Sequence, residues 1–379
     1  DVEWALADGR PFLLQARPIT NLSGEVQAEV PVEIPEGFWQ REASHSPQPY
    51  SPFCSSIFFR PRIVATRHMA SEFGFLAEGL EFREIGGWEY MRVVPLGGKD
   101  RAAPPAWLMP LLIRLVPQMR RRIRQSVTAV RTDKAGHCCE QWYGAWQPEI
   151  ATRIAALQDV PLSTLSDAEL DAHLTQALRL LEDGLKVHFI LHGAVGLVLA
   201  DFAFACRDLL GLDERGAFEM LNGLSEKSTE PARALTRLAQ MARERPAVRR
   251  LLDQIDESTP GRLAEADQYF ADAFAAYQHE YGWRCLRYEV YDPTVAESPV
   301  LVLNLIRDQI LMDFDPAARD AALAQQRAAA VAAACAGLAA KAEEDRARFK
   351  RALARAERAY PIREDNEFFT VSVPLALVR

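Results

Sequence analysis

An alanine-rich stretch near the end of the sequence places the tightest limit on the fold. Of the 43 residues from 317 to 359, 20 are Ala, the residue with the highest intrinsic helix propensity. Asp315-Pro316 precedes the stretch as an N-capping side chain followed by Pro at the first helical position, and no other Pro occurs before Pro361. The pattern predicts one helix over 317–359, about 65 Å long at ~1.5 Å per residue.

Helical signals also dominate the middle of the sequence. Ser166-Asp-Ala-Glu169 has the form of a capping box and opens a predicted helix that runs toward residue 210. Helical periodicity resumes at 213–224, 230–242, 246–256 and 260–281, Pro299 starts a further helix, and an earlier helix is expected around 57–73. A short β-ribbon is expected over 82–94, broken at Gly86-Gly87. The fold class is therefore mainly α, a large irregular helical domain with a small β-ribbon.

Composition and charge exclude several classes of protein. The 379 residues are 49% hydrophobic and 25% charged, which is not the composition of a disordered chain. A net charge of −8 argues against a general nucleic-acid binder. Six Cys without framework spacing indicate reduced thiols, and the longest apolar run, 189–200, is too short to span a bilayer. We expect a cytoplasmic protein with neither nucleic acid nor membrane as partner.

The first twenty residues carry the signal of a β-hairpin. Asp8-Gly9 separates two runs in which apolar and polar residues alternate. When the apolar sets face each other across the ladder, the expected pairs are Trp4 with Leu14 and Leu6 with Phe12. This register puts Glu3 opposite Gln15 with Arg17 further along the same face, and it needs an odd loop with a bulge at Gly9.

The polar face of this hairpin has two interpretations on spacing alone. Oxygen ligands such as those of Glu3 and Gln15 suit Mg²⁺, and the neighbouring Arg17 suits a phosphate. The alternative is a solvated hairpin face that carries polar residues by chance.

A family resemblance favours the first interpretation. Asp1-Val-Glu-Trp-Ala-Leu-Ala-Asp-Gly9 and Leu14-Gln-Ala-Arg-Pro-Ile-Thr20 resemble the closing strands of the ATP-grasp domain in phosphoenolpyruvate synthase, pyruvate phosphate dikinase and rifampicin phosphotransferase. The resemblance implies that Glu3 and Gln15 bind the metal of Mg-ATP and that Arg17 contacts the nucleotide phosphate. It also implies Mg²⁺ and ATP as cofactor and substrate of the full-length enzyme.

The rest of the sequence resembles the substrate domain of the rifampicin phosphotransferase branch. The similar segments, in order, are 45–52, 87–92, 220–224 with 228–230, 281–284 with Glu289, 297–299 and 363–365. The implied organisation is a closing ATP-grasp hairpin over 1–20, a linker over 21–37 and a helical substrate-binding domain over 38–379. Trp283 and Cys285-Leu286 replace the His and the Gly-Pro of the rifampicin-type stretch, so rifampicin itself is not the expected acceptor.

The same resemblance implies what the chain lacks. The family's phosphate-carrying His lies in a separate swivelling domain, and none of the seven His here has its sequence context. We therefore expect a fragment that is inactive alone and whose partners are ATP, a small-molecule acceptor and its own ATP-grasp and phosphohistidine domains. The acceptor is expected to be a hydroxyl-bearing organic molecule. The alternative is a non-catalytic helical ligand-binding or scaffold module that keeps an ATP-grasp remnant.

Four residues are candidate substrate contacts. Arg284 and Glu289 lie in an aromatic-rich extended segment, where the Arg either binds an anion or pairs with the Glu to tie the segment to a helix. His188 and His192 are spaced i, i+4 on one helix face, which suits two metal ligands. No third ligand is evident, so core or pocket histidines are favoured over metal.

Two further patterns stay open. The run Arg114, Arg120, Arg121, Arg122, Arg124 and Arg131 contains no acid, and a solvated face or a contact to an acidic surface is favoured over nucleic acid. Aromatic and Met residues between 38 and 146 either line an apolar cleft or form the core of an irregular region.

Overall fold

A computed structural model describes residues 2–7, 10–16, 32–98, 104–225, 227, 229–285, 288–312 and 315–379. The chain divides into two compact units, Asp1–Pro35 and Glu36–Arg379. In the larger unit, helices dominate and the sheet has only three antiparallel strands, so the predicted fold class is confirmed.

The smaller unit is an antiparallel hairpin of β1 (Val2–Ala7) and β2 (Arg10–Ala16). Glu3 pairs with Gln15, as predicted. The other predicted pairs are wrong, because Trp4 faces Leu13 and the register shifts between Glu3 and Trp4. Ala7 pairs with Arg10 at the end of the ladder. The predicted bulge at Gly9 and the predicted phosphate contact Arg17 both lie outside the described residues.

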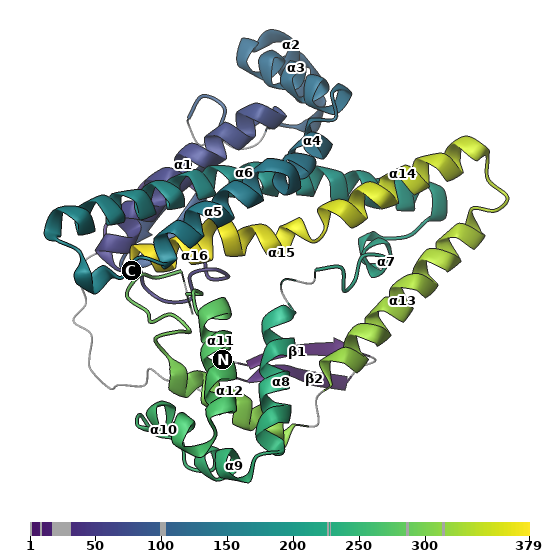
Figure 1. Ribbon diagram of the computed structural model, residues 1–379. Coiled ribbons are helices and arrows are strands. Elements are labelled where there is room, and N and C mark those ends of the chain that lie inside the picture. The colour runs from purple at the N-terminus through teal and green to yellow at the C-terminus, as the bar shows by residue number, and fades with distance from the viewer. Residues whose placement is uncertain are drawn as a thin grey trace. The chain divides into compact units, whose positions relative to one another are not determined.

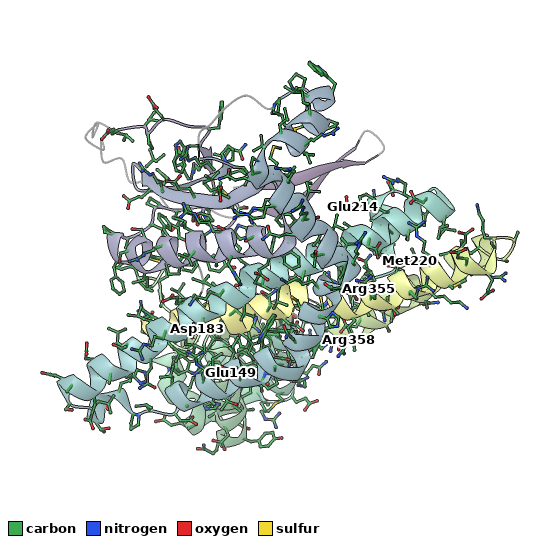
Figure 2. All side chains as sticks on the ribbon, turned by 90° about the horizontal axis from the view of Figure 1, so that it is seen from above. Glu149, Asp183, Glu214, Met220, Arg355 and Arg358 are labelled. Carbon is green, nitrogen blue, oxygen red and sulfur yellow. The ribbon has the colours of Figure 1, made fainter. Side chains whose placement is uncertain are left out.

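One long helix organises the larger unit. α6 (Asp167–Leu210) opens with the predicted Ser166–Glu169 capping box and closes on Gly211 in the left-handed conformation. Packed around it are α1 (Pro52–Phe73), α4 (Lys134–Gln141), α14 (Glu343–Ala359), η4 (Phe368–Ser372) and α16 (Val373–Val378). Figure 1 shows α14 running along α6 on the opposite side from α1. Figure 2 labels Arg355 and Arg358 on this stretch of α14.

α6 is the one described helix that is long and apolar enough to cross a membrane, with an 18-residue window of mean hydropathy 1.9. Half of that window is buried inside the fold. Its largest buried side chains include Leu180, Leu191 and Phe202, which belong to the main hydrophobic core. The apolar sequence of α6 is thus accounted for by its central position in this core.

A small sheet and a helical hairpin lie at one side of α1. β4 (Ala77–Ile85) and β5 (Trp88–Pro95) form the predicted ribbon, and β3 (Gln40–Arg41) adds to β5 in the order β3-β5-β4. η1 (Ala106–Leu108), α2 (Met109–Leu115) and α3 (Pro117–Arg131) follow, and α3 packs on α1. The other short elements of the larger unit are η2 (Trp142–Trp146), α5 (Gln147–Gln158), η3 (Leu162–Thr164) and α7 (Glu214–Glu219), of which α5 and α7 pack on α6.

A second hydrophobic core belongs to what we call the α8–α12 lobe. It consists of α8 (Glu230–Arg243), α9 (Pro246–Leu252), α10 (Thr259–Ala266), α11 (Gln268–Tyr281) and α12 (Pro299–Leu311). The predicted helix over 260–281 is interrupted at Asp267, whose side chain accepts a hydrogen bond from the Phe270 N–H at 2.8 Å and so begins a new helix.

The predicted single helix over 317–359 is wrong. It is two helices, α13 (Pro316–Gly337) and α14, which diverge from a turn at the edge of the unit (Figure 1). α13 ends at Gly337, and the acidic first turn of α14, which begins at Glu343, suits the positive end of a helix dipole. The reversal allows Phe349 and Ala356 to be buried. The chain then ends in α15 (Ile362–Glu367), η4 and α16.

Candidate functional site

A cavity of about 410 Å³, here called the central cavity, opens beside α6. Its apolar wall combines side chains from α1, the β-ribbon, α6 and η4: Phe58, Leu80, Phe82, Met91, Leu185, Phe189 and Val371. Its polar groups are Glu42, His45, Tyr50, Arg62, His188, His192, Tyr288, Arg363, Glu364 and Glu367. An apolar cavity with a few convergent polar groups is the usual form of a small-molecule site.

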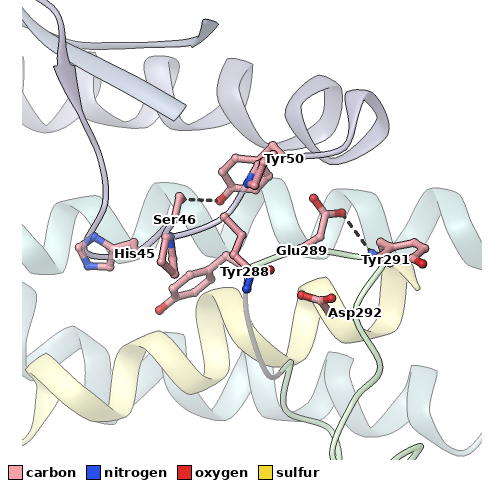
Figure 3. Close-up of a pocket in the computed structure, with 10 residues that line it drawn as sticks. His45, Ser46, Tyr50, Tyr288, Glu289, Tyr291 and Asp292 are labelled. Atoms are coloured by element: carbon pink, nitrogen blue, oxygen red, sulfur yellow. Dashed lines mark hydrogen bonds between the residues drawn. The ribbon is translucent and has the colours of Figure 1, made fainter. Parts of the chain in front are cut away.

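A smaller pocket of about 210 Å³ adjoins the central cavity and shares His45, Tyr50 and Tyr288 with it. Figure 3 shows this pocket between the proline-rich loop, which carries Ser46 and Tyr50, and the extended segment at 288–292. The two hollows therefore share one wall. This wall is formed by the proline-rich loop and the extended segment, which lie more than 200 residues apart in the sequence.

A buried ion pair fixes the position of the proline-rich loop. Glu89 on β5 is fully buried and accepts a hydrogen bond from Arg62 of α1 at 2.6 Å. The Ser46 hydroxyl also donates to Glu89 and contacts the Tyr50 hydroxyl at 3.1 Å. The guanidinium of Arg62 lies 3.9 Å from the ring centroid of Phe82. Because every one of these groups is held by another, the loop is a fixed wall of the cavity.

Glu42 holds the start of the same loop. Its buried carboxylate accepts hydrogen bonds from the Ser44 hydroxyl, from the backbone N–H groups of Ser44 and His45, and contacts His45 Nδ1 at 3.1 Å. Burial raises its pKa, but the hydrogen bonds from Ser44 and His45 outweigh that effect and hold the pKa below its usual value. Glu42 is therefore an anion with its own partners.

His188 and His192 both line the central cavity, on neighbouring turns of α6, with ring centroids 6.2 Å apart. Burial and then the neighbouring His192 lower the pKa of His188 to about 3, and burial also lowers the pKa of His192. Thr370 Oγ1 lies 3.4 Å from His188 Nδ1. Gly184 allows this approach of η4, since a Cβ there would lie 2.3 Å from the Thr370 carbonyl oxygen. At neutral pH both rings are uncharged hydrogen-bonding groups.

Tyr288 closes the cavity from the extended segment. Its hydroxyl donates to Glu367 of α15 at 2.7 Å, and burial followed by the Glu367 charge raises its pKa. His45 packs against the Tyr288 ring with centroids 6.2 Å apart, and Phe58 stacks on it at 6.5 Å. Tyr288 thus connects loop, helix and cavity wall, although the sequence analysis did not single it out as a contact.

The two other predicted contacts lie apart from each other. Glu289 lines the smaller pocket, and its carboxylate accepts bonds at 2.8 Å from both the backbone N–H and the hydroxyl of Ser51, the N-cap of α1. Arg284 stacks over Phe368 at 4.4 Å, and its Nε is buried without a hydrogen-bond partner. Within the described residues no bond joins Arg284 to Glu289, so the alternative of an Arg284–Glu289 pair is not found there, and Glu289 ties the segment to α1.

The aromatic and Met residues between 38 and 146 divide between the two roles left open by the sequence. Tyr50, Phe58 and Met91 line the central cavity, while Phe59 and Trp142 are buried in the core. Phe38 and Trp107 do neither and are largely exposed.

The described residues include no group of three or more His, Cys, Asp or Glu side chains that could hold a metal ion. In the hairpin, Glu3 and Gln15 are direct cross-strand partners, which places both residues at one register position. Oxygen ligands of this kind suit Mg²⁺ with phosphate oxygens completing its shell. Arg17, the predicted phosphate contact, lies outside the described residues.

Part of this chain is similar to proteins that are already known. Residues 190–364 match the family described as the rifampicin phosphotransferase fourth domain. The chain is also 27% identical over 300 residues to chondramide synthase cmdD of Chondromyces crocatus, a match that covers 76% of this chain and 7% of the synthase. The chain thus spans a small part of that relative's length. The predicted resemblance to rifampicin phosphotransferase is confirmed as a similarity over residues 190–364, which match the fourth domain of that family.

Proposed function

We propose that the central cavity binds the phosphoryl acceptor of an ATP-dependent phosphotransferase, and that the acceptor is an uncharged, hydroxyl-bearing organic molecule. One observation carries this proposal. Three segments that resemble the rifampicin phosphotransferase branch, 45–52, 87–92 and 363–365, each contribute a side chain to the central cavity, and Glu289 of a fourth lines the adjoining pocket. These segments lie far apart in the sequence and meet at the two hollows.

The charges in the cavity support an uncharged acceptor. Arg62 is engaged by Glu89, Arg363 contacts Glu364 at 3.0 Å, and Glu367 accepts from Tyr288. A charged ligand would compete with these partners, whereas an uncharged hydroxyl finds the neutral rings of His188 and His192. The apolar wall supplies the area that such a ligand buries.

The chemistry proposed for the site is positioning. A neutral imidazole accepts the hydrogen bond of the acceptor hydroxyl and aims its oxygen at the incoming phosphoryl group. The oxygen forms the new bond to phosphorus while the bond from phosphorus to the carrier histidine breaks, and the hydroxyl proton passes to the ring nitrogen of the carrier histidine that the phosphoryl group leaves. Phosphoryl transfer depends mainly on such orientation and on charge neutralisation. ATP, Mg²⁺, Glu3, Gln15, Arg17 and the carrier domain belong to this proposal through the family resemblance, as does a cytoplasmic location.

Calorimetric titration of this chain tests the acceptor site. The probes are flavanones and anthraquinones with free hydroxyl groups, each paired with its fully O-methylated counterpart. We expect binding of at least one hydroxylated probe, at least tenfold weaker binding of its methylated counterpart, and loss of binding in His192→Phe. His279→Phe on the exposed side of α11 is the matched control and should bind as the wild type does. If no hydroxylated probe binds, or if both variants behave alike, the cavity is not the acceptor site.

ATP consumption by the full-length protein separates this proposal from a non-catalytic binding module. We expect consumption that depends on the bound probe, and Glu3→Ala should abolish it while leaving probe binding by the cavity unchanged. Probe binding without any ATP consumption would establish the binding module instead.

A further inference from the structure

The hairpin formed by α2 and α3 carries a surface that the proposed function does not use. Residues 104–132 contain six Arg and no acidic residue. The whole chain has a net charge of −8, so the remainder carries −14. Positive charge is therefore concentrated on this hairpin, whereas the rest of the chain is acidic.

α3 is anchored through a single arginine, which leaves the others exposed. Arg122 is buried and pairs with Glu78 of β4 at 3.5 Å. Gly74 at the end of α1 fits against α3 so closely that a Cβ would lie 2.3 Å from the Arg122 carbonyl oxygen. In the described part of the chain, no ion pair engages the five other arginines: Arg114, Arg120, Arg121, Arg124 and Arg131. The basic face is thus rigidly held and unneutralised.

An apolar ridge lies on η1 and on α2, the helix that precedes and packs on α3. Trp107 is 78% exposed and Leu115 64% exposed, and Leu111 lies between them at helical spacing. α2 contains no buried residue, and its packing partners are η1 and α3. Figure 1 shows the α2–α3 hairpin projecting from the body of the larger unit. Large apolar side chains on a projecting helix fit a fluid apolar phase better than they fit water.

A hollow of about 590 Å³ beside α3 adds hydrogen-bond donors to the arginines. Arg121 and Arg124 line it together with Lys134, Thr128 and Thr132. Lys134 is paired with Glu72, so the two arginines supply its free positive charge. Guanidinium and hydroxyl groups are the usual ligands of phosphate oxygens, and Arg is favoured over Lys where a phosphate is bound by two parallel hydrogen bonds.

We propose that the α2–α3 hairpin binds the surface of an anionic phospholipid membrane. Trp107, Leu111 and Leu115 enter the interface between headgroups and acyl chains, and the arginines of α3 contact the headgroup phosphates. A Trp- and Leu-bearing apolar face beside a basic face is the pattern of segments that lie in the membrane plane. Such contact needs no spanning helix, so it does not depend on the length of any apolar run. The acidic remainder of the chain faces away from the membrane.

Sedimentation of the chain with phospholipid vesicles tests this proposal. We expect binding to vesicles of phosphatidylglycerol mixed with phosphatidylcholine, little binding to phosphatidylcholine alone, and release by molar salt. Arg120→Gln with Arg124→Gln should weaken binding roughly 25-fold, about fivefold for each arginine near an anionic surface. Arg250→Gln with Arg262→Gln, exposed arginines on the α8–α12 lobe, is the control with an equal change in charge and should bind as the wild type does.

Tryptophan emission gives a readout that charge alone would not move. Vesicle binding should shift the emission to shorter wavelength, and Trp107→Phe should remove most of that shift without changing the melting temperature, because residue 107 is exposed. Equal binding of both vesicle types, or equal loss in the two double-arginine variants, would overturn the proposal. So would tight binding of poly-glutamate with no binding of vesicles, which would make the hairpin a docking site for an acidic protein.

Discussion

The two hydrophobic cores of the larger unit are built from different kinds of residues. In the α8–α12 lobe the helices come from neighbouring stretches of sequence, and the core is made of side chains such as Leu238, Phe270 and Leu303. The buried polar residues on the described helices of this lobe are Thr236 and Thr259, and each bonds to groups a few residues away. The lobe is thus a local structure closed on an apolar interior.

The region around the central cavity buries charge instead. Glu42, Arg62 and Glu89 are buried there, and they join a loop, a helix and a strand that are distant in sequence. Replacing a buried ion pair with apolar residues of equal volume is often neutral or stabilising, so stability alone does not require these charges. The comparison therefore indicates that they serve to hold the proline-rich loop as a cavity wall.

Loss of Glu89 should produce the largest effect. Glu89→Ala leaves Arg62 buried without its partner and should lower the free energy of unfolding by about 3–5 kcal/mol. The control is Arg358→Ala, which breaks an exposed pair with Glu140 and should cost no more than about 1 kcal/mol. Urea denaturation measures both. Similar losses in the two variants would contradict the distinct role given to the buried pair.

Phe270→Ala tests whether the lobe is independent of the cavity. Phe270 is fully buried, and its truncation should destabilise by about 3–5 kcal/mol. Because its neighbours belong to the second core, faster hydrogen exchange should be confined to α8–α12, and the binding of a hydroxylated probe to the cavity should be unchanged. Faster exchange in α6 as well would show that the two cores unfold as one.

The same contrast explains which elements the sequence predicted. α6, α12 and the β-ribbon were predicted because a capping box, a Pro at a helix start and a Gly-Gly turn act locally. The break between α13 and α14 was missed, since a run of Ala carries no signal of chain reversal and the break follows from packing of α14 on α6. Sequence signals that act within a few residues predict where a helix begins, but they do not predict a break that depends on tertiary contacts.

The site was predicted only in part for a related reason. His188, His192 and Glu289 stand out by spacing or by resemblance, and all three line one of the two hollows. Arg62 and Glu89 carry no pattern, because they pair with each other across a helix and a strand. Glu42 was missed as well, although its partners Ser44 and His45 lie in its own loop. Arg62 lies between the rings of Phe58 on α1 and Phe82 on β4, and only the folded arrangement of the sheet against α1 brings its partner Glu89 to it.

The pH dependence of stability should sharpen the contrast, because two oppositely shifted groups lie in the cavity region. Burial lowers the pKa of His188 to about 3, so its contribution is present above its unfolded pKa of about 6.5 and is lost as pH falls toward 3. Burial raises the pKa of Asp365 to about 6 against an opposing hydrogen bond from Ser225, so its contribution is present below about pH 4 and lost as pH rises to about 6.

Between pH 4 and 6 these two slopes oppose each other in the wild type. His188→Asn should therefore make stability fall more steeply as pH rises, and Asp365→Asn should make it rise with pH, each by roughly 1 kcal/mol per pH unit. Urea unfolding at a series of pH values measures the three slopes. Parallel curves for the wild type and both variants would show that neither group is shifted.

The smallest expected difference concerns two helix caps. Asp267 caps α11 in the lobe through the Phe270 N–H, and Asp267→Ala should cost about 1 kcal/mol. Ser51 caps α1 through the Cys54 N–H at 3.1 Å and also donates to Glu289 at 2.8 Å, so Ser51→Ala removes a cap and leaves a carboxylate oxygen with one partner fewer. It should cost roughly 1 kcal/mol more than Asp267→Ala and weaken probe binding, because Glu289 holds the segment that carries Tyr288. Equal losses with unchanged probe binding would mean that the cavity wall does not depend on the link between α1 and the extended segment, and that the two regions differ in composition but not in how they are held.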